Sequence, residues 1–170
     1  KLQGLPQVTG QQLDAMDLDK DLAAAKEASY TLFAAQRTLD DARDDFKDTA
    51  EANMYSTGKY QYVAAQHQWQ AAQYTYNAAV QSFETSFRTL YLQVKDYQQV
   101  LQAAKTALAT EQDNFAAAQK KHDLGNLSDN ALADAKDKVS EAQDKVDGAA
   151  IDLFSAYNNY RWAVDHGILN

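Results

Sequence analysis

The feature that most constrains the fold is a spacing of apolar residues that alternates between three and four. In the middle of the chain this spacing continues for more than five heptads, with Glu111 as the exception. The positions are Val80, Phe83, Phe87, Leu90, Val94, Tyr97, Leu101, Ala104, Leu108, Phe115 and Ala118. Such a repeat is typical of long helices that supercoil against neighbouring helices.

Two further runs have the same spacing. The first contains Ala25, Ala28, Leu32, Ala35, Leu39, Ala42 and Phe46. The last contains Leu132, Ala135, Val139, Ala142, Val146, Ala149, Leu153, Ala156, Tyr160 and Ala163. Small residues in these seams let helix axes approach closely. We therefore predict an all-α fold, a long antiparallel coiled-coil helical bundle in which one long helix is flanked by two shorter helices.

The helix bounds follow from the runs and from the few residues that interrupt them. The chain has one proline and six glycines. Gly125 suits the left-handed residue that ends a helix, and Ser128 suits the N-cap of the next. We predict an extended N-terminal segment over 1–17, one helical domain over 18–167 and a tail over 168–170. Within the domain we expect helices over about 18–53, 59–121 and 128–165.

Composition excludes several classes of function. Without cysteine the chain has no disulfide and no thiolate metal site. The net charge of −8 disfavours nucleic acid and anionic membrane surfaces as partners. No apolar run approaches the ~18 residues of a membrane-spanning helix, and no signal peptide is evident.

The sequence offers no arrangement typical of catalysis. It contains no Gly-rich phosphate loop and no Ser/His/Asp constellation. His67, His122 and His166 lack the spacing of metal ligands, and the acidic run from Asp40 to Asp48 is expected to be a solvated helix face. We predict neither an enzyme nor a cofactor or metal site.

The segment from His122 to Gly167 carries a recognisable pattern. Gly125 is followed by Ser128, then by a ladder of alanines, and the segment closes on "DLFSAYNNYRWAVDHG". The ladder contains Ala135, Ala142 and Ala149. In this pattern the chain resembles the outer-membrane efflux protein family, the TolC-like exit ducts. The resemblance covers about residues 18–167 and implies one long helix with two shorter ones beside it.

The chain also departs from that family. His122 stands where an aromatic Tyr is usual, and Ala131 where Asp is common. The family's two membrane strands would lie in "DTAEANMYSTGKYQYV", which is too short for two strands of ~10 residues and a turn. The chain carries one repeat where the family usually has two. We therefore expect a soluble, strandless relative or an excised helical domain.

Two groups of residues are candidates for partner contacts. The first is the turn of Leu124, Gly125, Asn126, Leu127 and Ser128, a simple hairpin loop unless its apolar residues bind a partner. The resemblance implies that this turn docks to an adaptor protein of the membrane-fusion type. The second group is Tyr55, Tyr60 and Tyr74, aromatics that the heptads do not use. Tyr62, Trp69 and Tyr76 continue the heptad of the long helix and are expected in the core.

Two classes of function remain open. One is a duct or assembly component of an envelope export system, with self-association or an adaptor as partner. The other is a structural or adhesive coiled-coil spacer of a cell-surface protein. Ile151, Phe154 and Trp162 lie outside the main seam of the last helix and favour the duct. Either reading places the chain outside the cytoplasm, in the cell envelope. A pore-forming toxin is disfavoured because a long apolar hairpin is missing.

Overall fold

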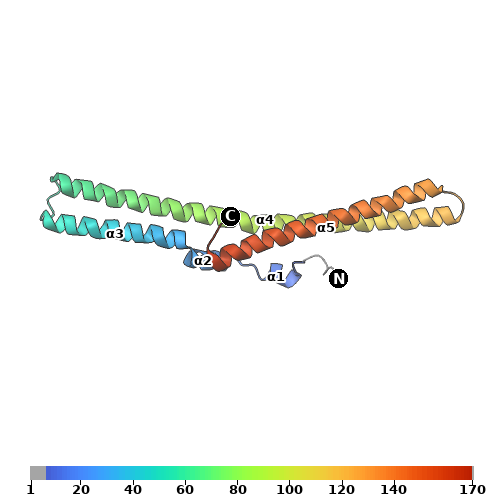
Figure 1. Ribbon diagram of the computed structural model, residues 1–170, viewed down its shortest axis with the longest axis horizontal. Helices are drawn as coiled ribbons and strands as arrows, with labels where there is room; N and C mark the ends of the chain where they lie inside the picture. Colours follow the sequence, from blue (N-terminus) through green and yellow to red (C-terminus); the bar gives the residue numbers. More distant parts are fainter. Residues whose placement is uncertain (1–6, 170) are drawn as a thin grey trace. The chain divides into compact units, whose positions relative to one another are not determined.

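The structure is a computed structural model that describes residues 7–169, and these residues form five helices and no strand. The expected all-helical fold is thus confirmed (Figure 1). The longest helix, α4, has 64 residues. The bounds are α1 Gly10–Asp14, α2 Leu18–Ala28, α3 Tyr30–Ala52, α4 Tyr60–Asp123 and α5 Asp129–His166.

The chain forms two compact units. The first comprises Lys1–Met16 and Leu90–Tyr160, and the second Asp17–Thr89 and Arg161–Asn170. Both α4 and α5 contribute to each unit, and they begin and end within two residues of the predicted bounds. Asn170 of the predicted tail and residues 1–6 of the predicted N-terminal segment lie outside the described residues.

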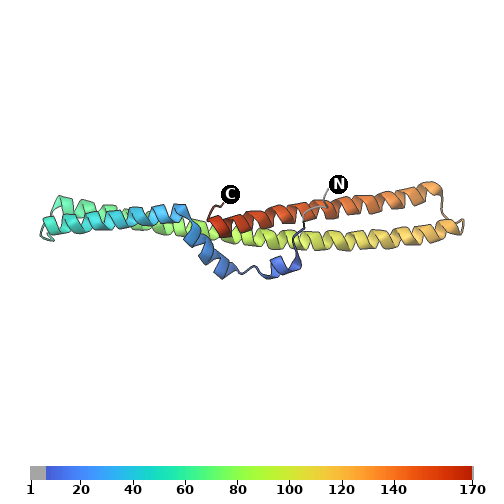
Figure 2. The ribbon, with the colours of Figure 1, turned by 60° about the horizontal axis from the view of Figure 1, so that its bottom comes forward.

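In the first unit, α5 runs back along the second half of α4 (Figures 1 and 2). The deepest burial in this unit lies toward the end of α5, where Tyr160 is fully buried. The rings of Tyr91 and Tyr160 are 6.0 Å apart. Val94 and Leu153 are also almost completely buried. Burial of such side chains contributes roughly 1.5–3 kcal/mol each, which makes this end the stable part of the unit.

The predicted seam coincides with the buried side of both helices in this unit. Each predicted seam position from Leu90 to Ala118 is buried or half-buried, and so is Glu111. The predicted seam positions from Leu132 to Tyr160 on α5 are also buried or half-buried. Most residues between them are exposed, so the spacing of three and four identifies which side of each helix packs.

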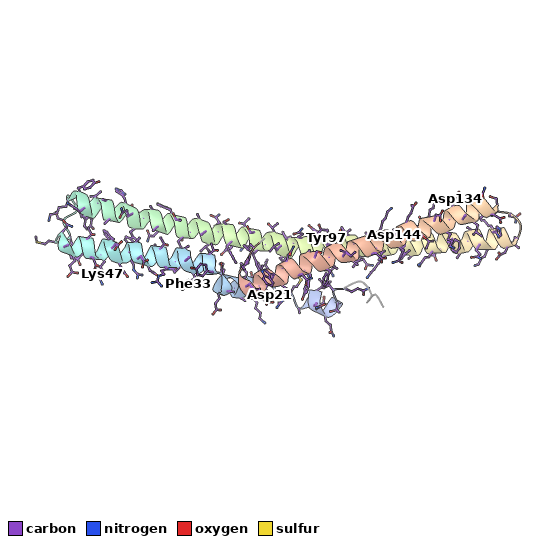
Figure 3. The ribbon with its side chains drawn as sticks, viewed as in Figure 1. Asp21, Phe33, Lys47, Tyr97, Asp134 and Asp144 are labelled. Carbon is purple, nitrogen blue, oxygen red and sulfur yellow. The ribbon has the colours of Figure 1, made fainter. Side chains whose placement is uncertain are left out.

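Enlarging a small seam residue is expected to destabilise this unit. Ala142 is 6% exposed, whereas Asp144 on the same helix is exposed (Figure 3). An Ala142→Leu change adds volume at a buried position of the seam and should lower the free energy of unfolding by ~1–3 kcal/mol. Asp144→Leu is the control and should change it little. Equal shifts in thermal melts of the two variants would contradict the seam described here.

The prediction that the segment before Asp17 is extended is wrong for part of it, because the segment contains a short helix. It contains α1, a single turn and a half whose N-cap Thr9 forms a capping box with Gln12. Leu13 in this helix is only 5% exposed, and Lys95 Nζ on α4 donates to its carbonyl oxygen at 3.4 Å. The sequence prediction missed α1 because five residues are too few to show a period.

In the second unit, α3 runs along the first half of α4 (Figures 1 and 2). Phe46 on α3 stacks on Trp69 of α4 with ring centroids 5.2 Å apart, and it meets the edge of Tyr62 at 5.3 Å. Tyr62, Trp69 and Tyr76 were expected in the core, and the structure has them half-buried.

The predicted continuous helix over 18–53 is wrong, because the helix breaks at Ser29. This residue ends α2 and caps α3, with an extended backbone (φ −76°, ψ 109°) and a side chain that accepts from Leu32 N–H at 3.4 Å. Ala28, a predicted seam residue, is consequently exposed, and Ser29 is buried in its place at 1% exposure. The backbone of Gly167 lies directly on Ser29, as a Cβ at Gly167 would come within 2.4 Å of Ser29 Cα.

An ion pair in the second unit should make its stability depend on pH. Lys26 Nζ on α2 bonds Glu84 Oε1 on α4, and Arg88 lies 3.5 Å from the other carboxylate oxygen. The hydrogen bond from Lys26, and then its charge, hold the pKa of Glu84 below its ordinary value of 4.5. A lowered folded-state pKa stabilises the protein above that ordinary value, and this stabilisation is lost as pH falls through the folded-state pKa.

We therefore expect the melting temperature of wild type to fall below about pH 4.5, and Lys26→Met to flatten that fall. Melting curves recorded between roughly pH 3 and pH 7 test this. Lys20→Met, which alters an exposed lysine on the same helix, is the control. Parallel profiles for wild type and Lys26→Met would mean that the pair contributes nothing in solution.

Candidate functional site: the Gly125 turn

The turn between α4 and α5 begins with a well-formed helix end. Gly125 has φ +75°, the left-handed conformation that glycine adopts without a steric penalty. Its N–H donates to the His122 carbonyl at 2.8 Å, and the N–H of Asn126 donates to that of Lys121 at 2.9 Å. These two bonds form a Schellman motif, which satisfies carbonyls that a helix end leaves free. The predicted role of Gly125 is therefore confirmed.

The start of α5 is also held by local bonds. Ser128 Oγ accepts from the Ala131 N–H at 3.3 Å, and the Ser128 carbonyl accepts from the Leu132 N–H at 3.1 Å. Ser128 therefore serves as the N-cap that was predicted, with Asp129 in the first turn of the helix.

A side-chain contact across the turn was missed by the sequence reasoning. His122 Nε2 lies 2.7 Å from Asp129 Oδ1, and so joins the end of α4 to the start of α5. From the sequence, His122 stood out as a departure from a family pattern and as a histidine without the spacing of a metal ligand, but not as a partner of Asp129. The sequence did contain a signal for this contact, because His122 and Asp129 lie on either side of the glycine at which the chain reverses.

One of the two leucines in the turn is largely exposed to solvent. Leu124 is 76% exposed, while Leu127 is half-buried. Gly125, Asn126 and Ser128 are exposed as well. The structure thus brings the five predicted residues together in one turn, with Leu124 as its exposed apolar side chain.

The predicted aromatic candidates belong to the second unit and are not part of this turn. Tyr55, Tyr60 and Tyr74 are 63%, 82% and 77% exposed. Tyr55 lies in the connection between α3 and α4, and Tyr60 is the first residue of α4. Met54 and Tyr55 both have φ near +55°, which residues other than glycine rarely adopt.

Between residues 7 and 169, no cluster of His, Cys, Asp or Glu is placed to hold a metal ion. In the acidic run of α3, Arg43 pairs with Asp40 and Asp44 at 3.2 and 3.3 Å. Within the same range, no helix has the length and apolar character needed to cross a bilayer. The Gly125 turn can supply apolar contact through Leu124 and hydrogen bonding through the exposed side chains of Asn126 and Ser128.

The chain was compared with models of protein families and with curated proteins. No model of a known protein family matches the chain, and no curated protein matches its sequence. The resemblance to outer-membrane efflux proteins therefore stays a prediction from the residues quoted above.

Proposed function

We propose that this chain is a non-enzymatic helical component of an envelope export assembly, and that it docks to an adaptor protein through the Gly125 turn. The observation that carries the proposal is Leu124, a large apolar side chain that is 76% exposed on a turn held by its own hydrogen bonds. An exposed leucine on an ordered turn can bind without a large loss of conformational entropy. The resemblance to TolC-like ducts supplies the class of partner.

We also propose that α4 and α5 pack as an antiparallel coiled coil in the first unit. The support is the spacing of three and four, whose positions are buried or half-buried on both helices. In this proposal the hairpin is a stiff arm and the turn is its docking end. The chain would then act outside the cytoplasm, in the cell envelope, through protein contacts.

A coiled-coil spacer of a cell-surface protein is the second candidate. The length of α4 favours it, because 64 residues of helix extend ~95 Å, a useful reach for a spacer. A spacer needs no apolar residue at its turn, whereas a docking component does. Binding of an adaptor, and the dependence of that binding on Leu124, therefore separates the two functions and tests the proposal.

A further inference from the structure

The first part of α4 lacks the charges that cover the rest of the molecule. From Tyr60 to Phe83 the helix contains no Asp, Glu, Lys or Arg, although these residues make up 24% of the chain. On the neighbouring α3, exposed positions carry Asp41, Asp44 and Asp48. A solvated helix face normally carries such charges, and one in four residues is an ordinary share for a protein surface.

Half of the residues in this uncharged stretch are exposed to solvent. Exposed residues recur in adjacent pairs, three or four residues apart, from His67 and Gln68 to Thr85 and Ser86. They form one continuous face, which we call the neutral face, about 30 Å long at ~1.5 Å per residue. It contains Gln68, Tyr74, Ala78, Gln81, Ser82 and Ser86. Depletion of charge and an exposed tyrosine are two features that the neutral face shares with the central part of a protein interface.

We propose that the neutral face binds the same face of a second copy of this chain. Each copy carries a net charge of −8, so two copies repel one another where their acidic surfaces meet. The neutral face avoids that repulsion. Its Gln amides and Ser and Tyr hydroxyls each have a donor and an acceptor, so the face is complementary to itself. A contact that uses one patch on both copies is two-fold symmetric.

The shape of the neutral face indicates the register in which the two copies pair. Tyr74 is 77% exposed and projects from the face. One turn beyond it, Ala78, Gln81, Ser82, Thr85 and Ser86 line a shallow hollow of about 340 Å³. When two helices pair antiparallel about Ala78, Tyr74 of one copy lies opposite Ser82 of the other. Each tyrosine then covers the partner's hollow, and the contact occurs twice.

The pairing predicts a charge-dependent pattern of self-association. Wild type should form a reversible dimer in sedimentation equilibrium at concentrations up to roughly 500 μM. Ala78→Glu places two carboxylates against each other on the two-fold axis and should weaken the dimer at least about tenfold. Ala103→Glu adds the same charge at an exposed alanine of α4 outside the face, and should leave association unchanged.

Mixing two variants tests the symmetry itself. Ala78→Lys alone should also fail to dimerise, but a mixture of Ala78→Lys and Ala78→Glu should regain a dimer, because position 78 faces position 78. Circular dichroism of each variant shows whether the helices are intact. A monomeric wild type, equal effects at positions 78 and 103, or no recovery on mixing would each overturn the proposal.

Self-association through the neutral face does not depend on docking at the Gly125 turn. Self-association is measured with the chain alone, whereas docking is measured with an adaptor. A dimer that persists when Leu124 is changed, with adaptor binding lost, supports both proposals. If Ala78→Glu loses the dimer but still binds the adaptor, the two contacts lie on separate surfaces.

Discussion

Replacing Gly167 with alanine is expected to lower the free energy of unfolding by about 2–4 kcal/mol. A Cβ at this position would lie 2.4 Å from both Cα and N of Ser29 and 2.6 Å from the carbonyl carbon of Ala28. All three are backbone atoms, which cannot turn aside as a side chain does. Gly167 also has φ +62°, so alanine would be strained there even without a neighbour.

The chain has two ways to relieve this clash, and both are costly. It can shift the backbone at Ser29, which disturbs the cap of α3, or it can detach the segment from Gly167 to Leu169. Detachment would expose Ser29, which is 1% exposed in the native structure. Thermal unfolding measures the cost, and hydrogen exchange at the Leu32 amide, which donates to Ser29 Oγ, shows which way the chain yields.

Two other glycines provide matched controls. Gly125 has φ +75° but no atom within 4 Å of an added Cβ, so Gly125→Ala should cost only the backbone strain, about 1 kcal/mol. Gly148 lies within α5 in open space, so Gly148→Ala should stabilise the helix by up to ~1 kcal/mol. If all three variants melted alike, the close approach of Gly167 to Ser29 would be absent in solution.

The features predicted correctly from the sequence are those whose signal is periodic or local. The packing sides of α4 and α5 follow from spacing, because burial recurs with the turn of the helix. The Gly125 turn follows from residue chemistry within a few positions of the reversal. Neither inference needed knowledge of a distant part of the chain.

The features that were missed depend on tertiary contacts or on single residues. The break at Ser29 could not be read from "AKEASYTLF", because serine and alanine both occur in helices, and the residue packed on it is Gly167, far along the chain. The left-handed backbone of Met54 and Tyr55 has no local signal either, since neither residue favours it. The contact between His122 and Asp129 became evident only once both helix ends were placed.

Changing Leu124 to serine is expected to weaken adaptor binding by about tenfold while leaving the melting temperature nearly unchanged. Leu124 is 76% exposed, so the free protein gains little from its side chain. Against an adaptor surface it would bury most of its apolar area, at ~25 cal/mol per Å². This gives on the order of 1–2 kcal/mol, the size of a modest interface anchor.

Adding Leu127→Ser should weaken binding further, but it should also lower the melting temperature by a small amount. The reason is that Leu127 is half-buried in the free protein and loses packing when it is replaced. Leu92 provides the matched control for both variants. It is an exposed leucine of α4, at 58% exposure, and it lies outside the turn.

The measurement is adaptor affinity, by calorimetry or surface binding, beside the melting temperature of each chain. If Leu124→Ser and Leu92→Ser weakened binding equally, the contact would be spread along the helix and the turn would not be the docking end. If Leu124→Ser changed neither quantity, the adaptor would not use this turn, and the spacer function would be favoured. Docking through the turn requires a loss of affinity in Leu124→Ser and none in Leu92→Ser, because an exposed leucine that binds nothing contributes to neither quantity.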